Sequence, residues 1–529
     1  MARSDPLRHA SAALAAWTLA WALLTVLAWD LPLNNDIGWQ YWVARQLLGG
    51  ARFYRDIRES NPPLWFWEAM PLTAWADAFG VAPTHLAVAA VMARIVAAAA
   101  LIGALSDRRA GLHRIGAVTI LVVLGAFAFG ERDHLMAIGA LPYVMLIARR
   151  AGHVHVAVPL AIGVAVLAGW GFALKPHFLL VPVLIEGWLA LQLRRDWRSV
   201  RPETVTLTVL ALAYAAAILI LTPAYLTEEL PRVFSAYGDF KPPFGSLWTS
   251  QIYAPVWLLA AMTAVVIRQR RPVVACAAVA AVACLGIYAL QGKGFAYHAT
   301  PVTIAVAWMA WLSIDSERRR WARMVAWLPL ATAILMAVLI GPYRPPRLGT
   351  IASALDRLPP GATFALISAH SWDAFPLIER QRLVWPMRGL LLWTLPTIAR
   401  TGPDTPLARQ VRGEVIDDLW CHPPDAILFD DPRRSPAMPR TGPGAGFDYR
   451  TFALADPAAR RLLSAYRLTA QVDGATLWQR IRPIAPHGAG CRTITIRPAA
   501  NDTAFVFGAI SLFRAPASDS PRTASPPTG

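Results

Sequence analysis

The chain has few charged residues, very few lysines and few cysteines. Charged residues make up 16% of its 529 residues, well below the roughly 25% of soluble domains. Only 3 of its 50 basic residues are lysines, namely Lys175, Lys241 and Lys293. The 4 cysteines show no zinc-type spacing. The low share of charge excludes an ordinary soluble protein for most of the length.

Several enzyme motifs are also absent. The sequence has no phosphate-binding loop, no glycine-rich nucleotide loop and no serine nucleophile elbow. An enzyme that uses nucleotide-activated sugars needs a soluble nucleotide-binding domain, and the loops that we predict on the cytoplasmic side are too short to hold one. The sequence therefore argues against nucleotide-sugar chemistry.

Long apolar runs are what the sequence has in abundance. Hydrophobic residues make up 56% of the chain, and the mean hydropathy is +0.41. Runs near the length that crosses a bilayer recur along the first two thirds. They predict eleven membrane spans, at about 12–29, 85–105, 115–129, 134–148, 154–174, 176–193, 204–222, 253–267, 272–290, 299–314 and 322–341.

Arginine clusters follow the even-numbered spans. Because basic residues concentrate on the cytoplasmic side of membrane proteins, the clusters place the amino terminus in the cytoplasm and everything after the last span on the outer face. The formal net charge of +17 is then largely a topology signal, and no nucleic-acid partner is needed to explain it. The first span lacks a small-residue cleavage site, so we interpret it as a retained anchor. We expect a multi-pass protein of the cytoplasmic membrane.

Two domains are predicted, an all-α polytopic membrane domain and a small C-terminal α/β domain. Residues 1–341 form the membrane domain, whose first extracytoplasmic loop covers 30–84. A linker at 342–347 precedes the extracytoplasmic α/β domain at 348–515. The tail at 516–529 is rich in Pro, Ser and Thr and is expected to be disordered.

The α/β domain is predicted from alternating strand and helix patterns. Asp456 as N-cap and Pro457 at the first helical position predict a helix that runs to Tyr466. Apolar segments that read as strands lie at 363–368, 426–429 and 476–480.

The four cysteines divide into two pairs. Cys276 and Cys284 lie in one predicted span and are expected to be buried packing residues. Cys421 and Cys491 lie in the α/β domain, where a disulfide is permitted. The sequence leaves open whether their geometry allows one.

The first extracytoplasmic loop holds the main catalytic candidate. Asp36 comes about seven residues beyond the first span. It is suited to be the N-cap of a helix over 37–48, but a carboxylate held at membrane level is costly without a function. Further along, Asn61 before two prolines predicts another helix start, and the tryptophan-rich helix that follows is expected to lie among the lipid headgroups.

A second polar cluster is Glu131-Arg132-Asp133-His134. The two flanking spans are predicted at about 15 residues each, which is short for a bilayer. The cluster is therefore expected below the outer surface, in a protein-lined cavity, rather than in a solvated hairpin. The acidic spacing of Glu131 and Asp133 is compatible with a divalent cation, although two carboxylates make an incomplete metal site.

Two more predicted outer turns each bring lysine and histidine to the same face. The first contains Lys175 and His177, and the second runs from Lys293 to Tyr297 and His298. Each lysine alone is readily explained as a side chain that reaches from a span end to the interface. Their convergence on the face that bears Asp36 predicts one shared site. The loop after the seventh span adds Asp239 and Lys241 as possible substrate contacts.

The membrane domain resembles the GT-C superfamily of integral membrane glycosyltransferases, most closely the branch that uses dolichyl- or undecaprenyl-phosphate sugars. That branch includes the protein O-mannosyltransferases and the aminoarabinose transferase of lipid A. One position departs from the pattern, because the family often has Asp-Glu where Ile37 follows Asp36 here. The residues that carry the resemblance are Asn35-Asp36, Ala44-Arg45-Gln46-Leu47-Leu48-x-Gly50, Tyr54-x-Asp56, Asn61-Pro62-Pro63-Leu64, Glu131-x-Asp133 and Lys293-x-x-x-Tyr297-His298.

The resemblance implies that a sugar is transferred from a polyprenyl-phosphate carrier to a hydroxyl of a lipid, glycan or protein acceptor. The transfer inverts the anomeric centre of the sugar and takes place among the membrane lipids. A phosphate leaves readily, so one carboxylate base and several cations are sufficient. Asp36 is the predicted base, and no cofactor is implied beyond a possible divalent cation. The predicted phosphate ligands are, in order, Lys293, Lys175, Arg132 and His298, with Glu131, Asp133, His177, Tyr297 and Asp56 as further substrate contacts.

Two other classes of protein stay open from the sequence. A polytopic transporter or lipid flippase is one, since Arg94 and Glu186 fall inside predicted spans. No internal repeat is visible, which argues mildly against a transporter. An envelope assembly scaffold without catalysis is the other, although it has no need for a large polar first loop with a buried acid.

Overall fold

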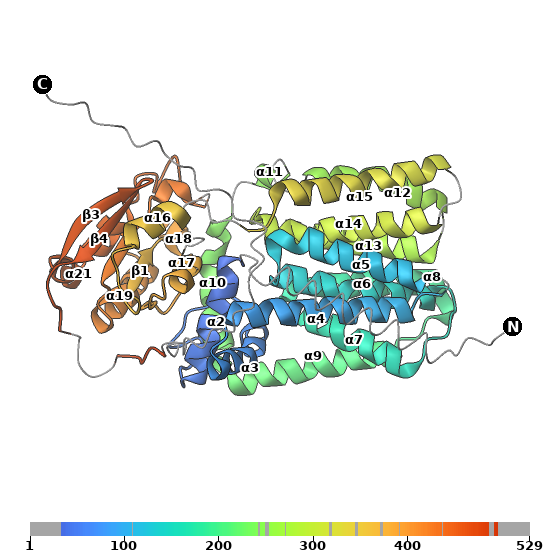
Figure 1. Cartoon of the computed structure of the whole chain (residues 1–529), viewed down its shortest axis with the longest axis horizontal. Coiled ribbons are helices and arrows are strands. Elements are labelled where there is room, and N and C mark those ends of the chain that lie inside the picture. The colour runs from blue at the N-terminus through green and yellow to red at the C-terminus, as the bar shows by residue number, and fades with distance from the viewer. Residues whose placement is uncertain are drawn as a thin grey trace, which may run out of the picture.

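The computed structural model shows a long helical bundle at one end of the molecule and an α/β unit at the other (Figure 1). The predicted first span, part of the linker and the C-terminal tail lie outside the residues that it describes. The described residues are 33–107, 109–241, 244–248, 253–269, 271–316, 320–343, 348–370, 374–390, 392–435, 437–485 and 491–495.

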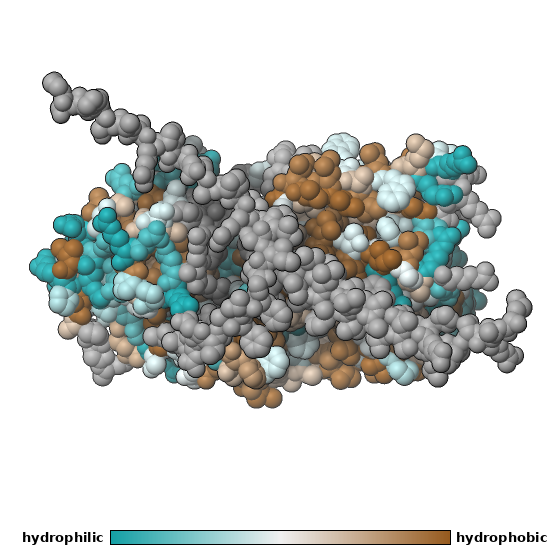
Figure 2. Space-filling model, in the orientation of Figure 1, coloured by the Kyte–Doolittle hydropathy of each residue, from teal (hydrophilic) through white to brown (hydrophobic). Residues whose placement is uncertain are grey.

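Helices occupy all ten predicted spans beyond the first. Six segments within the described residues are long and apolar enough to cross a membrane, so the chain is a multi-pass membrane protein, and the predicted count of eleven spans is not confirmed. Figure 2 shows hydrophobic residues gathered over the bundle and hydrophilic ones over the α/β unit. The helices are α4 (Pro83–Ala104), α5 (Ala110–Gly125), α6 (Arg132–Ala151), α7 (Val158–Ala173), α8 (Leu180–Leu193), α9 (Pro202–Leu221), α12 (Tyr253–Gln269), α13 (Pro272–Gln291), α14 (Ala296–Ser316) and α15 (Arg320–Ile340).

The polar cluster at 131–134 begins a helix, which corrects the prediction of two short spans. Helix α6 has 20 residues, and the segment before it spans 19 residues from Ala110 to Ala128, including the 3-10 turn η1 (Ala126–Ala128). Glu131 has the extended backbone of an N-cap residue, with ψ of 152°. Apolar periodicity missed the first turn of α6 because its polar side chains are buried by other helices.

Two helices of the first loop lie between the bundle and the α/β unit. Helix α2 (Asn35–Leu48) is capped by Asn34, whose side chain accepts a hydrogen bond from the Asp36 amide, so Asp36 lies in the first turn and the predicted N-cap was wrong. Helix α3 (Leu64–Phe79) begins after Pro63, and Asn61 is not its N-cap either. The Asn61 side chain instead donates to Glu59, a partner outside the helix.

The segment between α9 and α12 is built from short helical turns. It contains a π-helical turn at Tyr225–Glu229 (η4), α10 (Leu230–Ala236), η5 (Tyr237–Phe240) and α11 (Phe244–Leu247). Short turns connect the membrane helices α7 and α8 as well, through η2 (Pro176–Leu179), and η3 (Arg194–Asp196) follows α8. The η2 and η5 turns carry residues of the site described below.

The α/β unit holds a four-stranded sheet of order β1-β2-β4-β3. Strands β1 (Phe364–Ile367) and β2 (Ala426–Phe429) are parallel, and β4 (Ala475–Arg480) is antiparallel to β2 and to β3 (Tyr466–Val472). Three of the strands were predicted, and β3 was missed because five of its seven residues are exposed or half-buried and give no apolar alternation. The helices of the unit are α16 (Leu348–Leu355), α17 (Ala374–Arg380), α18 (Leu395–Thr401), α19 (Pro406–Cys421), α20 (Tyr449–Leu454) and α21 (Pro457–Leu463), with a 3-10 turn, η6 (Pro432–Arg434).

Local predictions for this unit hold in part. Asp456 caps α21 and Pro457 is its first residue, as predicted, but the helix ends at Leu463. Cys421 and Cys491 form a disulfide, which the sequence had left open. Cys276 and Cys284 are buried and unpaired, as expected.

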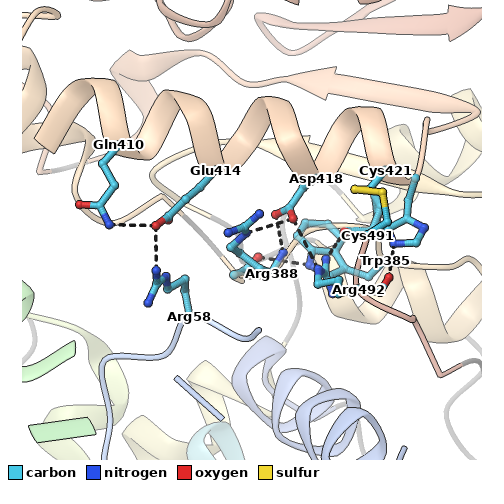
Figure 3. Close-up of polar contacts among 12 residues, drawn as sticks. Arg58, Trp385, Arg388, Gln410, Glu414, Asp418, Cys421, Cys491 and Arg492 are labelled. Atoms are coloured by element: carbon cyan, nitrogen blue, oxygen red, sulfur yellow. Dashed lines mark hydrogen bonds and ion pairs between the residues drawn. A yellow bond between two sulfur atoms is a disulfide. The ribbon is translucent and has the colours of Figure 1, made fainter. Parts of the chain in front are cut away.

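The α/β unit packs directly on the first loop. The Phe375 amide of α17 donates to the Asn35 side chain at 3.0 Å. Gly38 permits this approach, because a Cβ there would lie 2.7 Å from the Phe375 Cβ. The backbone of Arg58 forms a bridge with Gly389, and its guanidinium pairs with Glu414 of α19 at 2.9 Å (Figure 3).

The segment 491–495 also contributes to the interface between the α/β unit and the first loop. Figure 3 shows Asp418 and Cys421 on one side of α19, facing Arg492 and Cys491. The disulfide holds this segment to α19, and the Gln46 side chain of α2 exchanges two hydrogen bonds with the backbone of Thr495, at 2.8 and 2.9 Å. Helix α2 is thereby held by the α/β unit on one side and by α3 on the other.

Candidate active site

A cavity of about 300 Å³ lies where the bundle, the first loop and the α/β unit meet. Its floor comes from the ends of α6, α13 and α14, one wall from α2 and the 58–61 turn, and another from η5. Its lining residues include Asp36, Arg58, Glu59, Asn61, Trp65, Arg132, Lys175, His177, Tyr237, Lys241, Gln291, Lys293, Tyr297, His298, His370 and Trp393.

Asp36 reaches this cavity from the first turn of α2. Its Oδ2 accepts a hydrogen bond from Arg132 Nη2 at 2.9 Å, and its side chain keeps 22% of its surface exposed. The Arg132 guanidinium is buried and stacks over the Trp65 ring, 4.3 Å from its centre. Arg132 therefore fixes the carboxylate while leaving part of it open to the cavity, which is the arrangement that a base needs.

Lys175 is held by Asp133 and Gln291 in a buried triad. Its ammonium donates to Asp133 Oδ2 at 2.6 Å and to Gln291 Oε1 at 3.0 Å, while the Gln291 amide donates to Asp133 Oδ1 at 3.0 Å. Lys175 and Gln291 line the cavity, and Asp133 lies behind them. Asp133 thus supports a cation and is not itself among the cavity-lining residues.

The three lysines of the chain all line this one cavity. The Lys293 ammonium lies 3.2 Å from the centre of the Tyr237 ring. The stem of Lys241 passes Gly292, whose positive φ of 61° ends α13 just before Lys293. Burial, together with the neighbouring Lys241 and Lys175, holds the pKa of Lys293 well below its usual range. An anion placed here would raise the pKa of Lys293 again and favour its charged form.

Histidine and tyrosine side chains complete the floor. His177 comes from η2, and Tyr297 and His298 come from the first turn of α14. The Tyr297 ring contacts His298 edge-on at 4.3 Å and lies 5.6 Å from the Lys175 ammonium. These three predicted residues are brought together with Asp36 and the lysines around the cavity.

Besides Asp133 and Asp239, two more predicted residues do not line the cavity. Asp56 pairs with Arg52 at 2.8 Å, at a surface position that does not line the cavity. Glu131 is fully buried behind the wall, and burial together with the nearby Asp36 raises its pKa well above the usual range. Within the described ranges, no group of three or more His, Cys, Asp or Glu side chains gathers as a metal site needs. The suggested cation site of Glu131 and Asp133 thus lacks a third ligand there.

Sequence reasoning missed several lining residues. Glu59 accepts hydrogen bonds from the Trp39 indole at 2.6 Å and from the Asn61 side chain at 2.6 Å, so it ties α2 to the turn before α3. Its place between Tyr54-x-Asp56 and Asn61-Pro62-Pro63-Leu64 was a usable signal. His370 and Trp393 enter the cavity from the α/β unit, and no local pattern marks them.

Glu229 provides a test of the polar interface beside the site. Glu229 is fully buried, and burial raises its pKa from 4.5 to about 7. Arg232 and Arg58 lower this pKa, whereas Glu59 and Glu414 raise it further. Between pH 4.5 and about 7 the folded state therefore binds more protons than the unfolded state. The free energy of unfolding falls as the pH rises through this range, by about 3 kcal/mol in total. Glu229→Gln is expected to raise the melting temperature at pH 8 and to leave it nearly unchanged at pH 4.5.

The control for this prediction is Glu228→Gln. The Glu228 side chain is 40% exposed and pairs with the exposed Arg55. Its replacement is expected to leave the pH dependence of melting as in the wild type. If Glu229→Gln showed the wild-type pH dependence too, the raised pKa of Glu229 would be refuted.

The bundle, the two loop helices and the cationic cavity beneath an α/β unit define a polytopic membrane protein with a polar site where bundle and α/β unit meet. Its fold is similar to that of ArnT, a GT-C glycosyltransferase. The crystal structure of ArnT from Cupriavidus metallidurans bound to undecaprenyl phosphate matches with a TM-score of 0.50 and 12% identity, over 89% of this chain and 98% of that one. The apo form of the same protein gives a TM-score of 0.47 and 13% identity over the same shares.

At this identity the match establishes the fold, and it confirms the resemblance that the sequence motifs indicated. No protein-family model matches the sequence, and no curated protein sequence matches it either.

Proposed function

We propose that this protein transfers a sugar from a polyprenyl-phosphate carrier to a hydroxyl acceptor on the outer face of the cytoplasmic membrane. The observation that carries the proposal is the placement of all three lysines of the chain around the cavity that holds Asp36. A compact ammonium is well suited to bind phosphate, and elsewhere the chain uses arginine. The match in fold to a protein solved with undecaprenyl phosphate supports the same donor class.

Asp36 acts as the base in the proposed reaction. Its carboxylate takes the proton of the acceptor hydroxyl, and the oxygen attacks the anomeric carbon of the sugar. The bond from that carbon to the phosphate oxygen breaks, and the electron pair leaves with the phosphate. Attack from the face opposite the leaving group inverts the anomeric centre. Arg132 orients Asp36 throughout, at 2.9 Å.

The lysines stabilise the departing phosphate. Lys293 and Lys241 approach from adjacent loops, and Lys175 is held in place by Asp133 and Gln291. Charge develops on the phosphate as the sugar leaves, so preorganised cations lower the barrier more than they stabilise the bound donor. Tyr297, His177 and His298 are placed to contact the sugar or the phosphate between them.

Mass spectrometry of envelope lipids and glycans tests this function. Cells that lack the protein are expected to lose one sugar from one lipid, glycan or protein, and to accumulate the carrier-linked sugar. Reintroducing the wild-type gene should restore both, whereas Asp36→Asn should restore neither. An unchanged profile in the deletion strain would overturn the proposal and favour the transport or scaffold reading.

A further inference from the structure

Helix α18 of the α/β unit holds the η5 turn, which forms one wall of the cavity. The Thr397 hydroxyl donates to the Ala236 carbonyl at 2.9 Å. Arg400 donates to the Asp239 carbonyl at 2.8 Å and pairs with the Asp239 carboxylate at 3.4 Å. These contacts lie on both sides of Tyr237, and Lys241 follows two residues after Asp239. The position of this wall therefore depends on the α/β unit.

A chain of three side chains runs from that unit to a lysine. Trp393, just before α18, meets the Tyr237 ring edge-on, with centres 5.5 Å apart and planes at 77°. The Tyr237 ring also contacts the Lys293 ammonium, which lies 3.2 Å from the ring centre. All three residues line the cavity. Trp393 is thus in contact with the residue that contacts Lys293.

Such a contact matters because lysine has a long, flexible side chain. An ammonium without a fixed neighbour samples many rotamers, and binding a phosphate must then restrict them. The quadrupole of an aromatic ring attracts the ammonium to the ring face, so the lysine samples fewer rotamers before the phosphate binds. The ring itself needs an orientation, and the edge-on contact of Trp393 supplies one.

We propose that Trp393 is a positioning residue of the donor site, which orients Tyr237 so that its ring holds the Lys293 ammonium toward the carrier phosphate. The α/β unit is on this account a necessary part of donor binding. The inference rests on the proposed function and extends it, because it assigns the unit a task in binding that same phosphate.

Binding of undecaprenyl phosphate to the full-length protein in lipid nanodiscs tests the proposal. Lys293→Met should weaken binding roughly 10- to 100-fold, since a charge-assisted hydrogen bond is lost. Trp393→Ala should weaken it roughly 10-fold, and Trp393→Phe, which keeps a ring edge toward Tyr237, should stay within about 2-fold of the wild type. Tyr237→Phe should also retain binding, whereas Tyr237→Leu should lose it.

Trp478→Ala is the matched control. Trp478 belongs to β4 of the same unit, outside the cavity. It should lower the melting temperature about as much as Trp393→Ala but leave binding within about 2-fold. Equal loss of binding in the two alanine variants would overturn the proposal, because the effect would then be general destabilisation. So would normal binding by Trp393→Ala and Tyr237→Leu while Lys293→Met is defective.

Two other results would contradict the proposed function itself. If the wild type does not bind undecaprenyl phosphate, or if Lys293→Met binds it normally, the assignment of this cavity to the donor phosphate fails, and the role of Trp393 fails with it. The two failures are therefore told apart by the wild type and the lysine variant alone.

Discussion

Asp36→Asn is expected to lower the rate of sugar transfer by roughly 10²- to 10⁴-fold, the usual contribution of a positioned general base. Asparagine has nearly the same shape, and its amide oxygen can still accept the hydrogen bond from Arg132, which lies 2.9 Å from the carboxylate. The variant should therefore insert, fold and bind undecaprenyl phosphate as the wild type does. The measurement is the initial rate of transfer in membranes, once mass spectrometry has named donor and acceptor.

Asp56→Asn is the control for this experiment. Asp56 lies in the same loop but pairs with Arg52, outside the cavity. Its replacement should leave the rate within about 2-fold of the wild type. Full activity of Asp36→Asn would remove Asp36 as the base, and equal loss in both variants would indicate that the loop, rather than one carboxylate, had been damaged.

Asp133→Ala is expected to destabilise the membrane domain by about 3–5 kcal/mol. The substitution leaves the Lys175 ammonium, which is only 5% exposed, without the carboxylate that it contacts at 2.6 Å. Gln291 also loses its acceptor. Thermal melting of the purified protein in detergent should show a large fall in melting temperature, provided that the variant is produced.

The double variant Asp133→Ala/Lys175→Met separates stability from function. Removing both charges should restore most of the stability, because no uncompensated buried ion remains. Donor binding should stay impaired, since one of the three lysines is missing. Asp107→Ala serves as the control, because Asp107 is 86% exposed and its pair with Arg149 should contribute less than about 1 kcal/mol. A single Asp133→Ala variant as stable as the wild type would show that the triad has no structural role.

Patterns that depend on neighbours in sequence were the ones that could be predicted. Apolar runs located the helices of the bundle, and Asp456 with Pro457 located the start of α21. Capping was less reliable where two candidates were adjacent. Asn34 caps α2 although Asp36 has the same preference, because the first loop enters the helix two residues earlier than the apolar pattern shows.

The site was predictable in part for the same reason. The lysines at 175, 241 and 293 stood out against a background of arginine, and the structure places all three around one cavity, while what they bind remains a prediction. Residues that reach the cavity through tertiary contacts had no such signal. Trp393 lies 156 positions from Tyr237 in the sequence, and nothing near either residue marks their contact.

The clamping of α2 by residues near the other end of the described chain has a consequence for the order of synthesis. Asn35 bonds to a residue 340 positions later, and Gln46 to one 449 positions later. The helix that bears Asp36 leaves the ribosome early, yet its bonding partners at 375 and 495 are made much later. A nascent or prematurely terminated chain thus carries an unfinished pocket. On the proposed function, the site that holds Asp36 is complete only once the α/β unit has docked on the first loop.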